Sequence, residues 1–226
     1  MARPREKHLD FFALQEAFQK AKNCAVCELE VRDLRRYFEV LLYESVNDVG
    51  VRARLVKSRG YCRRHAHLLL EQGDGQGTAL IIQDQVRLLL EHLAATGKGR
   101  AGIGRKGQPR SWNVAAGCPA CQHQVQRSAT LLQTLAEWLD DPGLRAAIEQ
   151  SPGLCAPHLL TALDCAPATG RAWLLAVHRE KYAQLAAELA EFIRKHDYRF
   201  RHEGYGPEGD SWIRAVIMMS GDRESI

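Results

Sequence analysis

The sequence lacks long apolar runs and has few aromatic residues, although its hydrophobic content is ordinary. Hydrophobic residues make up 46% of the 226 positions and aromatic residues 7%, which excludes disordered and fibrous classes. No apolar segment approaches the roughly 18 residues that a membrane-spanning helix needs. The charged N-terminus, with Arg3, Arg5 and Lys7, leads into an amphipathic stretch instead of the apolar core of a signal peptide. We therefore expect a cytoplasmic protein with no membrane partner.

The sequence also has little net charge and few signs of catalysis. Its formal charge of +4 is too small to require a nucleic-acid partner. It has no phosphate-binding glycine loop, no HExxH motif and no nucleophile elbow, so we predict no catalytic residues and a non-catalytic role. A hidden active site would draw first on the polar C-terminal residues Arg199, Arg201, His202, Glu203, Asp210 and Arg214.

Cysteine, in contrast, is present in an ordered pattern that occurs twice. Cys24 and Cys27 form a CxxC pair that is followed by Cys62 and His65, and Cys118 and Cys121 are followed in the same way by Cys155 and His158. Between residues 44–65 and 137–158, nine of 22 aligned positions are identical without a gap. The chain therefore contains an internal duplication with an offset of 93 to 94 residues.

The duplication predicts four segments. Residues 1–96 form the first helical repeat and residues 113–197 the second. Residues 97–112 lie in a stretch rich in glycine and basic residues, with no acid, which is typical of an exposed linker. Residues 198–226 form an unduplicated tail, and we expect it to fold back and anchor through Trp212 and Ile213.

Apolar residues recur at three- and four-residue steps through most of the chain, as in helices 9–21, 28–46 and 78–95. Pro119 and Pro157 follow cysteines at positions suited to a first helical turn, and Asp141 is placed as an N-cap. The predicted fold is all-α: an internally duplicated helical bundle, with each copy held by its own Cys3His site.

The Cys and His residues predict zinc. A CxxC pair at a helix start can direct two sulfurs to one point, and a CxxH pair at another helix start supplies the remaining ligands. We expect two Zn2+ ions per chain, each bound within one copy. The predicted ligand sets are Cys24, Cys27, Cys62 and His65 in the first copy, and Cys118, Cys121, Cys155 and His158 in the second.

Two alternatives to zinc remain open at this stage. The same residues could hold iron–sulfur clusters, since His can replace Cys as a ligand, or they could form a buried thiol cluster or disulfides. A redox enzyme with such centres is accordingly a further alternative for the function. Cys165 has no counterpart in the first copy, and we interpret it as a small buried apolar residue.

The complete motif set resembles an uncharacterised bacterial family with a domain of unknown function. The resemblance rests on the two CxxC…CxxH units and on the tail, in which Asp197 opens a DYRFRHE segment and Gly209 a GDSW segment. It covers nearly the whole chain. It implies this architecture and a cytoplasmic, bacterial origin, and it implies no reaction.

Two kinds of partner are compatible with these features. An unidentified protein partner fits a zinc-stabilised helical scaffold or regulatory interaction protein. Nucleic acid is the alternative, because basic residues cluster around the second half of the first metal motif with no acid among them. The residues of this basic cluster are Arg52, Arg54, Lys57, Arg59, Arg63 and Arg64.

Overall fold

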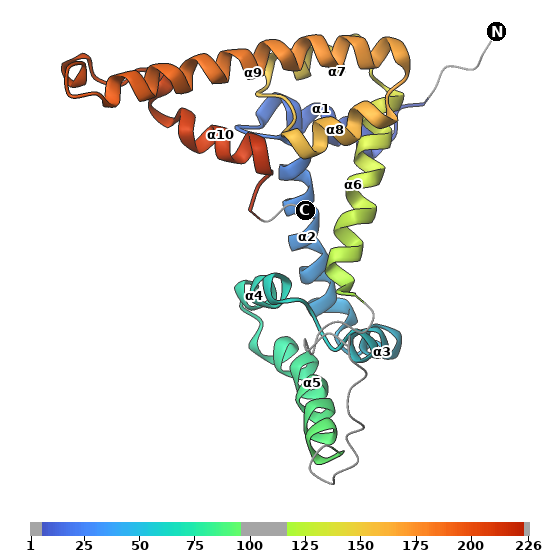
Figure 1. The fold of residues 1–226 in the computed structure, drawn as a ribbon. Helices are drawn as coiled ribbons and strands as arrows, with labels where there is room; N and C mark the ends of the chain where they lie inside the picture. The colour runs from blue at the N-terminus through green and yellow to red at the C-terminus, as the bar shows by residue number, and fades with distance from the viewer. Residues whose placement is uncertain (1–5, 96–116, 224–226) are drawn as a thin grey trace, which may run out of the picture. The chain divides into compact units, whose positions relative to one another are not determined.

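A computed structural model describes residues 6–95 and 117–223 (Figure 1). The predicted linker 97–112 lies outside these ranges. The described residues are helical almost throughout and contain no β-strand, which confirms the predicted all-α class. The first repeat and its leading helix comprise α1 (Leu9–Lys20), α2 (Ala25–Val40), the π-helical turn η1 (Leu41–Ser45), α3 (Val49–Ser58), α4 (Arg63–Glu71) and α5 (Gly75–Ala95).

The second repeat shows the same order of helices as the first. It comprises α6 (Pro119–Glu137), α7 (Pro142–Gln150), α8 (Ala156–Cys165) and α9 (Ala168–His196), which correspond to α2, α3, α4 and α5. The tail adds two 3-10 turns, η3 (Arg201–Glu203) and η4 (Pro207–Asp210), and α10 (Ser211–Ser220). The internal duplication is therefore present in the secondary structure as well as in the sequence.

Equivalent residues start and stop the equivalent short helices. The carboxylates of Asp48 and Asp141 accept hydrogen bonds from the backbone N–H groups of Val51 and Leu144, at 2.7 and 2.9 Å, and so cap α3 and α7. Both helices are followed by a glycine with positive φ, Gly60 at 88° and Gly153 at 93°. The capping role predicted for Asp141 is confirmed.

The chain divides into two compact units that do not coincide with the predicted repeats. Unit 1 comprises residues 1–31 and 126–226, and unit 2 comprises residues 32–125. The boundaries fall inside α2 and α6, so each of these helices begins in one unit and ends in the other. The compact units and the sequence repeats are thus two different divisions of the chain, and the repeat boundaries stay a prediction.

Each unit has its own apolar core. In unit 1, α1 packs against α7 and contributes Phe11, Leu14 and Phe18, which are almost completely buried. In unit 2, Phe38 and Tyr61 pack edge to face within a core that includes Leu69. These cores surround the cysteine motifs: Cys24, Cys27 and Cys155 belong to the first core, and Cys118 belongs to the second.

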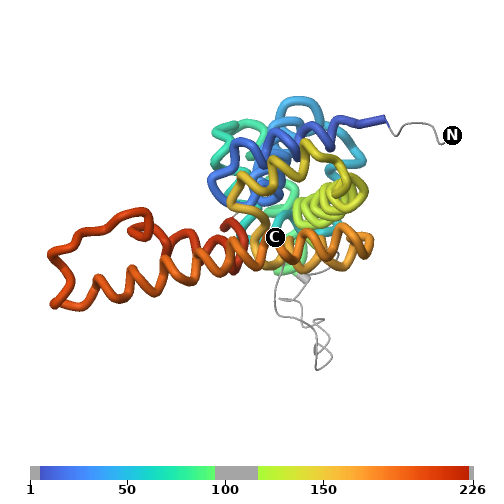
Figure 2. Tube along the Cα trace, turned by 90° about the horizontal axis from the view of Figure 1, so that it is seen from above, coloured from blue at the N-terminus to red at the C-terminus, as the bar shows by residue number. Residues whose placement is uncertain are grey.

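The tail folds back within unit 1. Figure 1 and Figure 2 show that the distal part of α9 and the two 3-10 turns extend beyond α7 and α8, and that α10 returns along α9. The return confirms the predicted direction of the tail, but the predicted anchors are wrong. Trp212 and Ile213 are 52% and 45% exposed, whereas Ser211 and Met218 are buried. The helix turns its Ser211–Met218 face toward α8 and α9 instead.

Candidate metal centres

The first metal centre lies in unit 1 and combines the CxxC motif of one repeat with the CxxH motif of the other. Centre 1 consists of Cys24, Cys27, Cys155 and His158, all of them buried. Cys24 directly precedes α2 and Cys155 is the N-cap of α8, so both halves of the centre lie at helix N-termini. The partial positive charge of a helix N-terminus favours the thiolate form of cysteine, which is the form that binds metal.

The geometry of centre 1 is regular. The His158 Nδ1 atom lies 3.4, 3.4 and 3.2 Å from the Sγ atoms of Cys24, Cys27 and Cys155. The Sγ atoms of Cys27 and Cys155 are 3.6 Å apart. One nitrogen is therefore nearly equidistant from three sulfurs, as in a tetrahedral ligand set.

The second metal centre lies in unit 2 and has the complementary composition. Centre 2 consists of Cys62, His65, Cys118 and Cys121, with Cys62 as the N-cap of α4 and Cys118 directly before α6. The His65 Nδ1 atom lies 3.4, 3.3 and 3.4 Å from the sulfurs of Cys62, Cys118 and Cys121. The Sγ atoms of Cys62 and Cys121 are 3.8 Å apart.

These distances fit one tetrahedral ion per centre. With Zn–S of about 2.3 Å and Zn–N of about 2.0 Å, a regular tetrahedron gives S···S of about 3.8 Å and S···N of about 3.5 Å. The ligand atoms of each centre all lie within 4.8 Å of one another, which leaves room for a single ion but not for several irons with bridging sulfides. The sulfurs are also too far apart for disulfides, whose S–S bond is about 2.05 Å, and all seven cysteines are free.

The predicted grouping of the ligands is wrong, although all eight residues fall into the two clusters. We predicted that Cys24 and Cys27 would join Cys62 and His65, but they join Cys155 and His158. The reason is helix length. The chain is continuously helical from Ala25 to Ser45, so its path at Ser45 is about 30 Å from Cys24. The next helix, α3, has 10 residues and is only about 15 Å long, which is too short to bring Cys62 back to Cys24.

Each ligating histidine is oriented by a buried polar residue that the sequence interpretation missed. The His158 Nε2–H group donates to the Glu30 carboxylate at 3.0 Å, and the His65 Nε2–H group donates to the Gln124 side-chain oxygen at 2.8 Å. Such partners fix the ring orientation and leave Nδ1 free to bind metal. Glu30 and Gln124 each lie three residues after the second cysteine of a CxxC pair, and this equal spacing in the sequence could have identified both as partners of the histidines.

Protons compete with metal for the ligands. Burial raises the pKa of Cys24 well above its usual value, and burial together with the neighbouring Cys118 thiol raises the pKa of Cys121 to about 12. Burial lowers the pKa of His65 to about 4, so its imidazole is neutral. At His158, burial lowers the pKa, but hydrogen bonds with Cys155, Cys27 and Glu30 overcome this and raise it to about 12. Metal binding must therefore displace thiol protons at both centres and, at centre 1, the Nδ1 proton of His158 as well.

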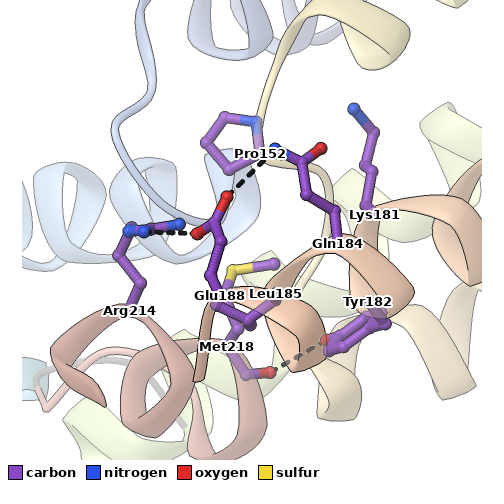
Figure 3. A pocket seen from close by; sticks show the side chains of 8 residues that line it. All are labelled: Pro152, Lys181, Tyr182, Gln184, Leu185, Glu188, Arg214 and Met218. Atoms are coloured by element: carbon purple, nitrogen blue, oxygen red, sulfur yellow. Dashed lines mark hydrogen bonds and ion pairs between the residues drawn. The ribbon is translucent and has the colours of Figure 1, made fainter. Parts of the chain in front are cut away.

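The tail closes over centre 1. The backbone N–H of Asp222 donates to the Cys27 sulfur at 3.5 Å, and the Tyr182 hydroxyl lies 3.1 Å from the Leu154 carbonyl and 3.0 Å from that of Met218. Figure 3 shows Tyr182 in the wall of a pocket between α9 and α10, where Arg214 pairs with Glu188 at 2.6 Å. The pocket has a volume of about 180 Å³. The unduplicated segment thus covers a metal ligand and the loop before Cys155.

The basic residues predicted to contact nucleic acid lie in unit 2, and several already have partners within it. Arg52 pairs with Asp84 at 2.7 Å, and the Arg64 guanidinium donates to Gln124 at 2.6 Å. Arg59 occupies the left-handed cap position of α3, with φ of 56°. The remaining members of the cluster, Arg54, Lys57 and Arg63, are exposed.

Four of the six tail residues considered for a hidden active site form surface ion pairs. Arg199 pairs with Asp197, Glu203 with Arg194, and Arg214 with both Asp210 and Glu188. Arg201 and His202 are exposed in η3. These contacts pair the charges with neighbouring residues of the tail and of α9.

Cys165 at the end of α8 is exposed, so its interpretation as a buried apolar residue is wrong. It lies outside both metal centres. Among the described residues, no helix has the length and apolar character needed to cross a membrane.

Comparison with known proteins identifies a relative and a family. The chain is 28% identical over 207 residues to an uncharacterized 23.9 kDa protein in the xynA 3′ region of Caldicellulosiruptor sp. (strain Rt8B.4), and the match covers 89% of this chain and 97% of that protein. No solved structure matches. Residues 6–225 match a family of unknown function, DUF6062. The chain therefore belongs to the DUF6062 family.

Proposed function

We propose that this protein is a zinc-stabilised, non-catalytic helical scaffold that holds two structural Zn2+ ions and binds another protein. The observation that carries the proposal is the completeness of both centres. Each has four protein ligands at separations that suit a tetrahedral Zn2+. A catalytic zinc site keeps one position for water or substrate, and a Cys3His set with all four ligands converging leaves none.

The positions of the ligands explain why zinc would act structurally. Centre 1 ties the start of α2 to the start of α8, and centre 2 ties the start of α4 to the start of α6. The linked helix starts lie far apart in sequence, so the free energy of metal binding becomes free energy of folding. A reducing compartment such as the cytoplasm keeps the thiols available, which supports the proposed cytoplasmic location.

The outer face of α10 supports a protein partner. Trp212, Val216 and Met219 are 52%, 63% and 60% exposed and follow one another at helical spacing. The only charged residue of α10, Arg214, is held in ion pairs. An uncharged face with Trp and Met is typical of a protein contact surface, where such residues contribute much of the binding free energy.

Nucleic acid remains the alternative partner, and a specific test separates it. Only Arg54, Lys57 and Arg63 of the basic cluster are exposed and outside the contacts described above. If they contact phosphates, changing all three to Gln should weaken binding to generic RNA or DNA, and the wild-type affinity should fall steeply with salt. If the wild-type protein does not bind nucleic acid at low ionic strength, the charges are a solvated surface.

Metal analysis of protein purified without added zinc tests the main proposal. We expect two zinc ions per chain and no iron. Removal of both ions by a strong chelator should reduce helicity and the melting temperature, because each centre fixes two helix starts. Fewer than one zinc per chain, or unchanged circular dichroism after complete removal, would contradict a structural role for zinc.

A further inference from the structure

The two metal centres differ in their access to solvent. In centre 1, the three cysteines Cys24, Cys27 and Cys155 are at most 1% exposed. In centre 2, Cys118 is 7% exposed, while Cys62 and Cys121 are only partly buried. A small oxidant in solution can therefore reach two thiolates of centre 2 and none of centre 1.

The centres also differ in the charge beside the ligands. The partner of the centre 1 histidine is the carboxylate of Glu30, which is 1% exposed. The partner of the centre 2 histidine is the neutral amide of Gln124, which also accepts a hydrogen bond from the Arg64 guanidinium at 2.6 Å. Arg63, which is exposed, directly follows Cys62. Cationic side chains near an accessible thiolate are typical of reactive cysteines, and they favour the approach of an anion or a polar oxidant.

The tail adds a third difference. The Asp222 backbone N–H donates to Cys27, and α10 packs against α8, whose N-cap is Cys155. Hydrogen bonds to a thiolate reduce its nucleophilicity, and the covering segment excludes small molecules. The partly exposed cysteines of centre 2, the arginines beside them and the C-terminal segment over centre 1 all favour oxidation at centre 2.

From these observations, which rest on the proposed zinc occupancy, we propose that Cys62 and Cys121 form an oxidative modification site for hydroperoxides, and that centre 1 is inert. The sulfurs are 3.8 Å apart, so only a small movement separates them from a disulfide. One thiolate attacks hydrogen peroxide and becomes a sulfenic acid while hydroxide leaves; the second thiolate then attacks the sulfenic sulfur and releases a second hydroxide. Two thiolates are oxidised by two electrons, and one peroxide is reduced.

Disulfide formation removes two of the four ligands of centre 2. Cys118 and His65 alone cannot retain a tetrahedral zinc, so the ion leaves. The disulfide keeps the N-terminus of α4 joined to the first turn of α6, but Cys118 and His65 no longer share an ion with Cys62 and Cys121. Oxidation thus removes the zinc of centre 2 and leaves a single covalent bond in its place, whereas centre 1 keeps its metal.

The test uses the full-length, zinc-loaded protein with Cys165→Ser, which removes an exposed thiol that belongs to neither centre. The metal content is measured first, and fewer than two zinc ions at this point contradicts the proposed function instead of the modification site. Hydrogen peroxide is then added with 4-(2-pyridylazo)resorcinol as the zinc indicator. We expect one zinc per chain to be released at least about tenfold faster than the other.

Peptide mapping of the product at the end of the fast phase identifies the modified cysteines. We expect a disulfide between Cys62 and Cys121, reversed by dithiothreitol with recovery of zinc binding. Release of both ions at the same rate, no release in excess peroxide, or a first disulfide that joins other cysteines overturns the proposal. Wild-type protein serves as the matched control and should release zinc with the same fast phase, because Cys165 takes no part.

Discussion

At the scale of single residues, the metal centres depend on polar groups behind the ligands as well as on the ligands themselves. Glu30 and Gln124 occupy equivalent positions in the two repeats, yet one is a carboxylate and the other an amide. A carboxylate partner makes the imidazole a stronger base, whereas an amide only orients it. The same fold therefore contains two candidate metal centres that differ in the charge behind the histidine.

Replacing Gln124 with Ala should weaken zinc binding at centre 2 alone. The substitution removes the acceptor of the His65 Nε2–H group, and loss of such a partner reduces metal affinity by about 10- to 100-fold. Competition with a chelator of known affinity measures the change for each of the two ions. Gln126→Ala, at an exposed position of the same helix, is the matched control and should leave both affinities unchanged. Equal weakening of both ions would contradict the assignment.

His178 should make the stability of unit 1 depend on pH. Its Nδ1–H donates to the Leu174 carbonyl at 2.9 Å, and its Nε2 accepts the Leu154 N–H at 2.9 Å, so the folded state requires the neutral ring. Burial lowers the pKa of His178 to about 4. The unfolded ring binds its proton at higher pH, so this contribution is present above about pH 6.5 and is lost as the pH falls toward 4.

The predicted loss is at most about 3 kcal/mol in the free energy of unfolding. Denaturant unfolding of the wild type and of His178→Gln at several pH values measures it, and the zinc contribution cancels in the difference. The stability advantage of the wild type over the variant should shrink from pH 7 to pH 4. An advantage that is constant across this range would show that His178 does not titrate between the two states.

At the scale of secondary-structure elements, the repeated helices are delimited by the same local chemistry. Asp48 caps α3, because its carboxylate accepts a hydrogen bond from the Val51 N–H group. Replacing Asp48 with Ala should lower the free energy of unfolding by about 1 kcal/mol, because a helix N–H loses its acceptor. Asp48→Asn keeps an acceptor oxygen and should restore most of the loss. Thermal unfolding of the two variants checks this, and equal destabilisation would contradict a capping role.

At the scale of the whole molecule, the exchange of half-sites between the repeats links metal binding to the complete chain. Neither repeat contains a finished centre, because each contributes a CxxC pair to one centre and a CxxH pair to the other. This arrangement makes a direct prediction about pairs of substitutions. Variants that combine Cys62→Ser with Cys118→Ser alter a single centre, so one zinc per chain should remain.

Variants that combine Cys62→Ser with Cys155→Ser alter both centres, so the zinc content should fall toward zero. If each repeat bound its own ion, the combination of Cys62→Ser and Cys118→Ser would remove both ions instead. Metal analysis of the two double variants therefore distinguishes the two arrangements. Circular dichroism at low temperature confirms that each variant retains enough helix for the comparison.

Features that depend on local chemistry could be predicted from the amino-acid sequence alone. The helices follow from apolar spacing, their starts from Asp141 and from the prolines after Cys118 and Cys155, and the eight ligands from two CxxC…CxxH patterns. These signals are local, because a cap or an amphipathic face is set by residues within a few positions of one another.

Which CxxC pair meets which CxxH pair depends on the tertiary structure. The spacing in the sequence allows each CxxC pair to share an ion with either CxxH pair. The long helices α2 and α6 determine where the chain continues, and so which pairs come together. The same holds for the tail, where apolar residues were expected to anchor and Ser211 and Met218 are buried instead. Spacing identifies the ligands of a metal centre, but the direction and length of rigid helices determine which of them share an ion.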